Sequence, residues 1–287
     1  IDTGIDSSVP DLKGAVIGGA DFSGLGSANG QTPVGSTGSE HGTLVASLAA
    51  GRGRGVGNAD GVIGAAPAAN LLAISIGFGE GDIDSDEQIA QAVRWAVDNG
   101  ADVINMSLTR NTLEWPQSWD DALLYAAEND VVVDAAAGNR GSGTTVVAPS
   151  EELVGVAPGG TVVRWGGTSG ATPIVAGIVA LVRAAHPELD AANVINRIIA
   201  TAKPAGDDGP DAIYGFGIVD AAAAVTATVA PDSPVAAPVG PSGVLIPTLP
   251  LLRGVGVPLL AIALLGASLI GIAAWVLRRV DALPRSR

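Results

Sequence analysis

Residues 88–107 read QIAQAVRWAVDNGADVINMS, and they decide the fold class. In Gln88–Asn99 the apolar side chains recur every three or four positions, the spacing of an amphipathic helix, and Asp86 stands near its start. Gly100 ends this pattern, and Ala101–Ser107 follows as a short apolar run typical of a buried strand. A helix that leads directly into a buried strand indicates an α/β protein.

The same alternation continues on both sides of this stretch. We predict strands at Ala15–Ala20, Asn70–Ile76 and Val131–Ala136, and a second helix at Trp119–Asn129. Strands that alternate with helices form right-handed crossovers, which give a parallel sheet with helices on both faces. Ligands of such sheets bind at the carboxyl ends of the strands.

A serine stands where a helix is expected to begin. Residues 166–173 read GGTSGATP and continue into IVAGIVALVRAAH, which is apolar on nearly every side and therefore predicts a buried helix. Pro173 fits the first turn of that helix. Ser169 would then lie among free backbone N–H groups that favour negative charge, a good position for a nucleophile. The alternative is a serine that only caps the helix.

The two histidines differ in their surroundings. His41 opens a run of small residues, HGTLVASLAAG, and its neighbour Gly42 leaves room around the ring. This setting suits a catalytic base, although a single histidine is more often structural. His186 precedes a proline at a predicted helix end, and we interpret it as structural.

Two further polar residues follow or end predicted strands. Asp2, in Asp-Thr-Gly, can point into the crevice at the carboxyl end of the sheet, although such a triplet is also an ordinary turn. Asn139 directly follows the strand at Val131–Ala136, and its amide could donate a hydrogen bond to an oxyanion. Gly-Asn is equally common in turns.

The order Asp, His, Asn, Ser in one α/β chain resembles the subtilisin family of serine proteases. The similarity covers most of residues 1–225 and includes six segments in family order: DTG from Asp2, HGT from His41, GAAP from Gly64, NGADVINMS from Asn99, AAGN from Ala136 and GTSGATP from Gly167. This order of the triad is a known example of convergent catalysis. The resemblance implies a peptidase domain over residues 1–229.

The resemblance also implies roles for individual residues. Ser169 would be the nucleophile, His41 the general base and Asp2 the residue that orients His41. Asn139 would stabilise the oxyanion together with the Ser169 backbone N–H. The primary specificity pocket and the substrate-binding segments would be lined by Ser107, Leu108, Thr109, Ala136, Ala137 and Gly138. The family usually has glycine at the position of Thr109, so we expect a narrowed pocket rim.

Composition excludes several other classes of function. The net charge is −14, and the residues up to 250 alone carry −18, so this acidic part would repel nucleic acid. The chain has no cysteine and two histidines, which argues against disulfides and metal-thiolate chemistry; no cofactor is expected. The glycine-rich Gly51–Gly57 follows a helix and lacks the Lys-Ser/Thr of a phosphate-binding loop, so we predict an ordinary mobile loop.

The C-terminal part predicts a membrane anchor. Residues 230–253 contain six prolines and form a predicted stiff linker. Residues 254–277 carry no charge and would form a transmembrane helix of about 36 Å, which exceeds the ~30 Å hydrocarbon core. The basic tail of residues 278–287 is expected in the cytoplasm, which places the peptidase domain outside the plasma membrane. A buried core helix is the alternative for residues 254–277.

Within the family, a proline-rich spacer and one C-terminal span resemble the mycosins, membrane-anchored proteases of actinobacterial type VII secretion. The resemblance implies a polypeptide substrate and the type VII secretion machinery as a partner. The absence of cysteine departs from this pattern, because mycosins commonly carry disulfides.

Two departures from the family favour a second hypothesis. The strand before Asp2 is cut to one residue, which suggests a fragment or a processed form, and Asn139 and Ser169 are only 30 positions apart. Val146–Pro149 resembles a family strand from further downstream, as if a strand, a turn and part of the substrate-binding wall were missing. The chain could therefore be an inactive, membrane-tethered binding or assembly component. We expect the sheet to close over this gap, the pocket side near Gly138 to stay open, and Ser169 to lie within hydrogen-bonding distance of His41.

Overall fold

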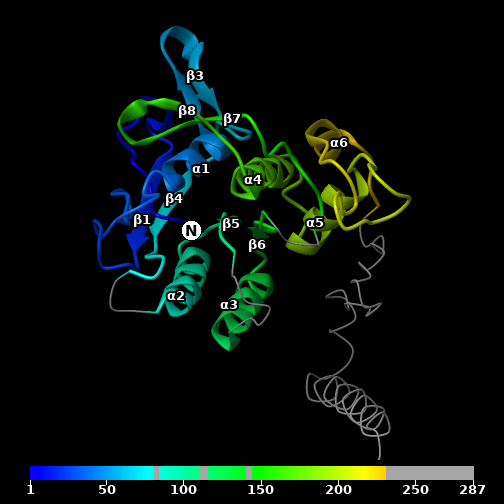
Figure 1. Cartoon of the computed structure of the whole chain (residues 1–287). Coiled ribbons are helices and arrows are strands. Elements are labelled where there is room, and N and C mark those ends of the chain that lie inside the picture. Colours follow the sequence, from blue (N-terminus) through cyan, green and yellow to red (C-terminus); the bar gives the residue numbers. More distant parts are fainter. Residues whose placement is uncertain (81–83, 110–115, 140–143, 231–287) are drawn as a thin grey trace, which may run out of the picture. The chain divides into compact units, whose positions relative to one another are not determined.

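A computed structural model describes residues 1–80, 84–109, 116–139 and 144–230 (Figure 1). These residues belong to one compact unit, Ile1–Val235. The predicted transmembrane helix, the basic tail and nearly all of the predicted linker lie outside the described residues.

Two pairs of parallel strands form the centre of this unit. β1 (Val16–Asp21) pairs with β4 (Leu71–Ser75), and β5 (Val103–Met106) pairs with β6 (Val132–Ala135). The four strands predicted from the sequence are confirmed, with ends that differ by one or two residues. Ile74, Ile104, Met106 and Val132 of the inner strands are buried, whereas Ile17 of β1 is exposed.

Helices lie on both faces of these strands, as predicted (Figure 1). α2 (Ser85–Asp98) and α3 (Gln117–Glu128) pack on one face around Ile74, Ile104 and Met106. α1 (His41–Ala50) and α4 (Thr168–Ala185) lie on the other face (Figure 1). α4 packs on Val132 together with α5 (Ala191–Ala200) and α6 (Ala221–Thr226).

Several boundaries differ from the prediction for a physical reason. α2 begins at Ser85, three residues before the predicted start at Gln88, because the Asp84 side chain caps it by accepting a hydrogen bond from the Asp86 N–H. Pro173 was expected in the first turn of its helix but lies deeper, because Gly167 is the N-cap of α4. Gly51–Gly57 was expected to be a loop but contains β2 (Arg52–Arg54), which forms an antiparallel hairpin with β3 (Asp60–Ile63).

A second antiparallel hairpin, β7 (Leu153–Val156) with β8 (Val162–Trp165), precedes α4. It fills part of the short stretch between Asn139 and Ser169. Val147 makes only an isolated bridge to Ile218 and belongs to no strand. Short 3₁₀ turns at Pro10–Leu12, Val56–Asn58 and Pro158–Gly160 complete the described elements.

The parallel strands do not form one continuous sheet. We expected the sheet to close over the shortened region, but among the described residues β6 pairs only with β5. β4 and β5 are not hydrogen-bonded to each other either; Ile1 and Asp2 lie between their ends. The sequence could not show this interruption, since each strand has the composition of an inner strand.

Within the described residues, α4 is the one helix long and apolar enough to cross a membrane. Half of its residues are buried in the protein, as expected of a core helix.

Candidate active site

Asp2 and His41 form the best-defined contact of the site. Nδ1 of His41 lies 2.9 Å from each carboxylate oxygen of Asp2. The Asp2 side chain is 7% exposed and the His41 side chain 30% exposed. The carboxylate therefore fixes Nδ1 of the ring as the protonated nitrogen and leaves Nε2 available on the other side.

Thr3 and Gly42 hold this pair in place. The Thr3 hydroxyl donates to the Ser39 carbonyl and accepts from the Gly42 N–H, so it joins the Asp2 segment to the start of α1. A Cβ on Gly42 would stand 2.2 Å from the Gly4 carbonyl oxygen, which only glycine avoids. The contact between Asp2 and His41 thus depends on a close approach of two backbones.

The pKa of His41 is raised above its usual value by Asp2. Burial alone would lower the pKa of the ring, but the hydrogen bond to Asp2 and the negative charges of Asp2 and Glu40 outweigh it. The ring also packs edge-on against Trp165 of β8, with ring centroids 5.7 Å apart. Trp165 was missed in the sequence because nothing in its local pattern marks it; only the β7–β8 hairpin brings it to His41.

Ser169 lies in the first turn of α4 and is tied to Ser107 by two hydrogen bonds. The Ser107 hydroxyl donates to the Ser169 carbonyl at 2.9 Å, and the Ser169 hydroxyl donates to the Ser107 carbonyl at 3.1 Å. Pro173, four residues later, has no N–H to offer the Ser169 carbonyl. Ser107 therefore supplies the hydrogen bond that the helix cannot.

Asn139 lies beside the start of α4. Its Oδ1 accepts from the Thr168 N–H at 2.8 Å, and its amide nitrogen donates to none of the described residues. A Cβ on Gly167, whose φ is +131°, would stand 3.2 Å from that Oδ1. The absence of a side chain at Gly167 therefore leaves room for Asn139 beside the start of α4, with its amide nitrogen uncommitted.

The predicted pocket residues come from the ends of β5 and β6, which are hydrogen-bonded neighbours. Ser107 and Leu108 are buried, whereas Thr109 is exposed. Thr109 faces Gly138: a Cβ on Gly138 would meet the Thr109 methyl group at 3.4 Å. Ala136 bonds back to β5, and Ala137 lies exposed between Ala136 and Gly138.

The structure thus brings the predicted site residues to the carboxyl ends of the parallel strands. The expected contact between Ser169 and His41 is not made. No hydrogen bond joins Ser169 to His41 in the described part of the chain, since the Ser169 hydroxyl is directed to Ser107. His186 lies at the other end of α4, where Nε2 contacts the Val225 carbonyl at 2.7 Å. That contact agrees with its interpretation as structural.

Comparison with known proteins shows the family of this chain. The model of the subtilase family matches residues 1–157 and again residues 151–217. The chain belongs to the subtilase family. Subtilisin E of Bacillus subtilis (strain 168) is 32% identical over 260 residues, which cover 78% of this chain and 64% of that relative. This subtilase therefore spans less than two thirds of the length of such relatives.

Solved structures resemble this subtilase as well. The MycP3 protease from the type VII (ESX-3) secretion system is 29% identical, with a TM-score of 0.64 over 79% of this chain and 82% of that one. MycP1 with its N-terminal propeptide removed is 25% identical, with the same TM-score over 80% of this chain and 90% of that one.

Proposed function

We propose that this subtilase is a serine-type endopeptidase that hydrolyses polypeptides through an acyl-enzyme. The observation that carries the proposal is the contact of both Asp2 carboxylate oxygens with Nδ1 of His41. In this arrangement Nε2 of His41 faces away from Asp2 as a proton acceptor. Membership of the subtilase family and the nearby Ser169 support it.

Acylation begins when the Ser169 hydroxyl leaves the Ser107 carbonyl and turns toward His41. This rotation exchanges one hydrogen bond, worth about 1 kcal/mol, for another, so it is a small step. His41 Nε2 accepts the hydroxyl proton as the Ser169 oxygen attacks the scissile carbonyl, and Asp2 stabilises the imidazolium that forms. His41 then gives the proton to the leaving amine. A water molecule then attacks the acyl-enzyme while His41 accepts its proton, and Ser169 is released with its hydroxyl restored as the acyl group leaves as a carboxylic acid.

The negative charge of the tetrahedral intermediate is met at the start of α4. The uncommitted amide nitrogen of Asn139 and the backbone N–H of Ser169 would donate to the oxyanion. The extended substrate would lie along Ser107–Thr109 and Ala136–Gly138 and form backbone hydrogen bonds with them.

A fluorophosphonate probe tests this proposal directly. We expect the full chain in detergent micelles to be labelled on Ser169 alone, and Ser169→Ala to lose labelling and peptide hydrolysis by several orders of magnitude. Ser8→Ala, which removes an exposed serine hydroxyl elsewhere, is the matched control and should be labelled normally. Labelling that persists in Ser169→Ala would refute the assignment.

We propose further that the enzyme is anchored in the plasma membrane. Support comes from the uncharged residues 254–277 and the basic residues 278–287, which favour a cytoplasmic C-terminus and an external peptidase domain. The similarity to MycP1 and MycP3 supports a mycosin-like role next to a type VII secretion system.

One observation favours a second function. Ser169 is hydrogen-bonded to Ser107 and not to His41, and the stretch from Asn139 to Ser169 is short. Moreover, the alignment with Subtilisin E is 260 positions long but includes only 78% of this chain. The relative therefore has residues within the aligned region that this chain lacks. An inactive, membrane-tethered assembly component would show a cooperative unfolding transition, but the fluorophosphonate probe would not label it. Probe labelling measured beside a thermal unfolding curve distinguishes the two functions.

A further inference from the structure

A chain of side-chain hydrogen bonds runs from β5 into the first turn of α4. The Asn105 amide nitrogen donates to the Ser107 hydroxyl at 3.0 Å, and this hydroxyl donates to the Ser169 carbonyl at 2.9 Å. A hydroxyl group has one proton, so Ser107 can donate to Ser169 only while Asn105 presents its nitrogen and not its oxygen. The orientation of the Asn105 amide therefore decides whether the Ser169 carbonyl has a donor.

The oxygen of the same amide is buried without a donor in the described residues, and so is Oδ2 of Asp134 on β6. Asn105 and Asp134 are register partners in the parallel pair of β5 and β6. The side chains of such partners lie on the same face of the pair, roughly 5 Å apart. Two side chains that each hold a buried, unpaired oxygen thus stand side by side.

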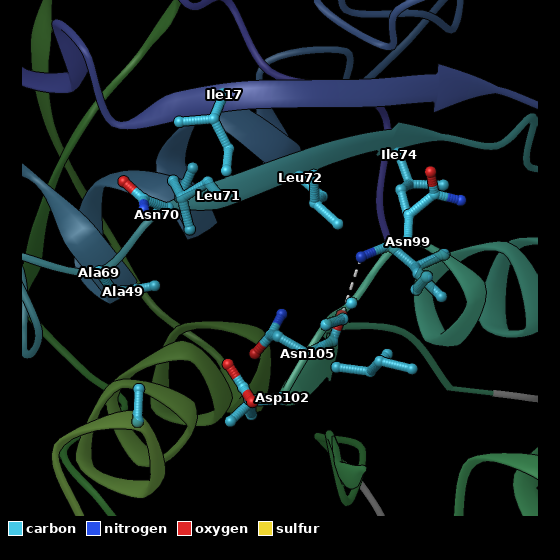
Figure 2. A pocket seen from close by; sticks show the side chains of 18 of the residues that line it. Ile17, Ala49, Ala69, Asn70, Leu71, Leu72, Ile74, Asn99, Asp102 and Asn105 are labelled. Carbon is cyan, nitrogen blue, oxygen red and sulfur yellow. Dashed lines mark hydrogen bonds between the residues drawn. The ribbon is translucent and has the colours of Figure 1, made fainter. Parts of the chain in front are cut away.

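Asn105 also lines a cavity of about 630 Å³ between β4 and β5 (Figure 2). Its side chain therefore borders open space on one side. The terminal torsion of asparagine is broad, so the Asn105 amide can turn over there. A turn of the amide exchanges the places of its nitrogen and its oxygen.

The state of Asp134 depends on its own burial. Burial raises the pKa of Asp134 to about 7. The titratable or charged side chains of β5, α3, α4 and α5, which pack against β6, either contact other groups or are exposed. The former are Arg183 with Asp130, Arg197 with the Ala224 carbonyl, and Tyr125 with Asp98; the latter are Asp102, just before β5, and Asp120, Asp121 and Glu128. Asp134 can therefore lose or gain its proton near neutral pH while these groups keep their own contacts.

We propose that Asp134 is a positioning residue for Ser169, an inference that rests on the peptidase function proposed above. It acts through Asn105 and Ser107. Protonated Asp134 donates to the Asn105 oxygen, which keeps the Asn105 nitrogen directed to Ser107. Ionised Asp134 can only accept, so the Asn105 amide turns its nitrogen to the carboxylate and its oxygen to Ser107. The Ser107 hydroxyl then donates to Asn105, and the Ser169 carbonyl loses its donor.

Loss of this donor loosens the first turn of α4. Pro173 has no N–H to replace the Ser107 hydroxyl, so the Ser169 carbonyl stays unpaired. The same turn carries the Ser169 hydroxyl and backbone N–H, and a small displacement of a nucleophile slows its reaction. We therefore expect ionisation of Asp134 to slow acylation roughly three- to fivefold. Deprotonation of His41 raises the rate by more than this, so the rate still increases with pH.

NMR of the full chain in detergent micelles, with ¹⁵N-labelled asparagine, tests the proposal without catalysis. The side-chain amide signal of Asn105 is identified by its absence in Asn105→Ala. We expect this signal to shift between about pH 5.5 and about pH 8.5, with a midpoint near 7. In Asp134→Asn, whose amide donates at every pH, the signal should not move. The exposed Asp207→Asn is the matched control and should behave like the parent chain. A signal that stays fixed in the parent, or that moves equally in Asp134→Asn, would overturn the proposal.

Phosphonate labelling measures the consequence for Ser169. The labelling rate of Asp134→Asn divided by that of the parent should be close to one at about pH 5.5 and roughly three to five at about pH 8.5. Asp134→Val removes the donor as well as the charge, and should label more slowly than Asp134→Asn at both pH values. A ratio that is the same at both pH values would refute the positioning role. Absence of labelling in every chain would refute the peptidase function and the positioning role with it, whereas the NMR shift still decides whether Asp134 orients Asn105.

Discussion

At the level of single residues, the charge of Asp2 controls when His41 can accept a proton. Asp2 raises the pKa of His41 above 6.5, and only neutral His41 is a general base. We predict that the rate of phosphonate labelling rises with pH through a midpoint above 6.5. The stability that the pair contributes has the opposite trend: it is complete below the unfolded pKa of about 6.5 and is lost as pH rises through the raised pKa.

Asp2→Asn separates the two effects of the carboxylate. The midpoint should move to lower pH, because the charge that raises the pKa is gone, while the labelling rate at its plateau falls by about 10⁴. A stopped-flow or gel-based pH series measures both. An unchanged midpoint in Asp2→Asn would mean that another group controls the profile.

Asn139 provides a prediction about the oxyanion. Asn139→Ala should lower kcat for peptide hydrolysis by about 10²–10³, with little change in KM, since its amide acts on the transition state. Steady-state kinetics on a peptide substrate give both constants. Asn129→Ala removes an exposed amide directly after α3 and should leave kcat unaltered. An equal loss in kcat for both variants would contradict the assigned role.

The sequence singled out Asp2, His41 and Asn139 through their order along the chain, which resembles the subtilisin family, because the local pattern of each residue alone also allowed a turn or a structural role. It did not predict the contact of His41 with Trp165 or the hydrogen bonds between Ser107 and Ser169. Those contacts join segments about 60 residues or more apart, and they depend on how the hairpin and α4 pack.

At the level of elements, β6 contains an unusual buried charge. Oδ2 of Asp134 is buried and has no hydrogen-bond partner in the described residues, although the side chain as a whole is half-buried. Burial raises the pKa of Asp134 to about 7. An unfolded aspartate ionises near 4, so the folded state binds more protons, and stability falls as pH rises from about 4 to about 7.

We predict that Asp134→Asn stabilises the fold in a pH-dependent way. The gain should be small at pH 4 and reach roughly 1–2 kcal/mol at pH 8, below the full linkage value because solvent reaches part of the side chain. Urea unfolding at both pH values measures it. Asp207→Asn, an exposed position, should give no gain at either pH. A gain that is equal at pH 4 and pH 8 would show that charge is not the cause.

Elements in which apolar side chains recur at a regular spacing were predictable from the sequence, and elements without such a spacing were not. The amphipathic α2 and the apolar β5 and β6 follow from the spacing of their own side chains. The hairpins β2–β3 and β7–β8 are short and rich in glycine, so their strands carry no clear alternation. The interruption between β4 and β5 lies in hydrogen bonds between strands, which no single segment encodes.

At the level of the whole molecule, the membrane anchor gives a prediction about orientation. External protease on intact cells should digest the acidic residues 1–229 and leave a tag after Arg287 protected, because basic flanks stay in the cytoplasm. Immunoblotting against both ends measures this. A variant with residues 254–277 deleted is the control and should be released from the membrane. Digestion of the C-terminal tag from outside, or release of the intact chain by high salt, would contradict the orientation.

The proline in α4 has a mechanical consequence for the whole site. Because Pro173 leaves the Ser169 carbonyl to Ser107, the end of β5 and the first turn of α4 are clasped together. Under the proposed function, a substrate that pairs with Ser107–Thr109 would bind beside the hydrogen bond that the Ser169 hydroxyl donates to the Ser107 carbonyl. We therefore expect substrate binding to weaken this hydrogen bond and to free the Ser169 hydroxyl to turn toward His41.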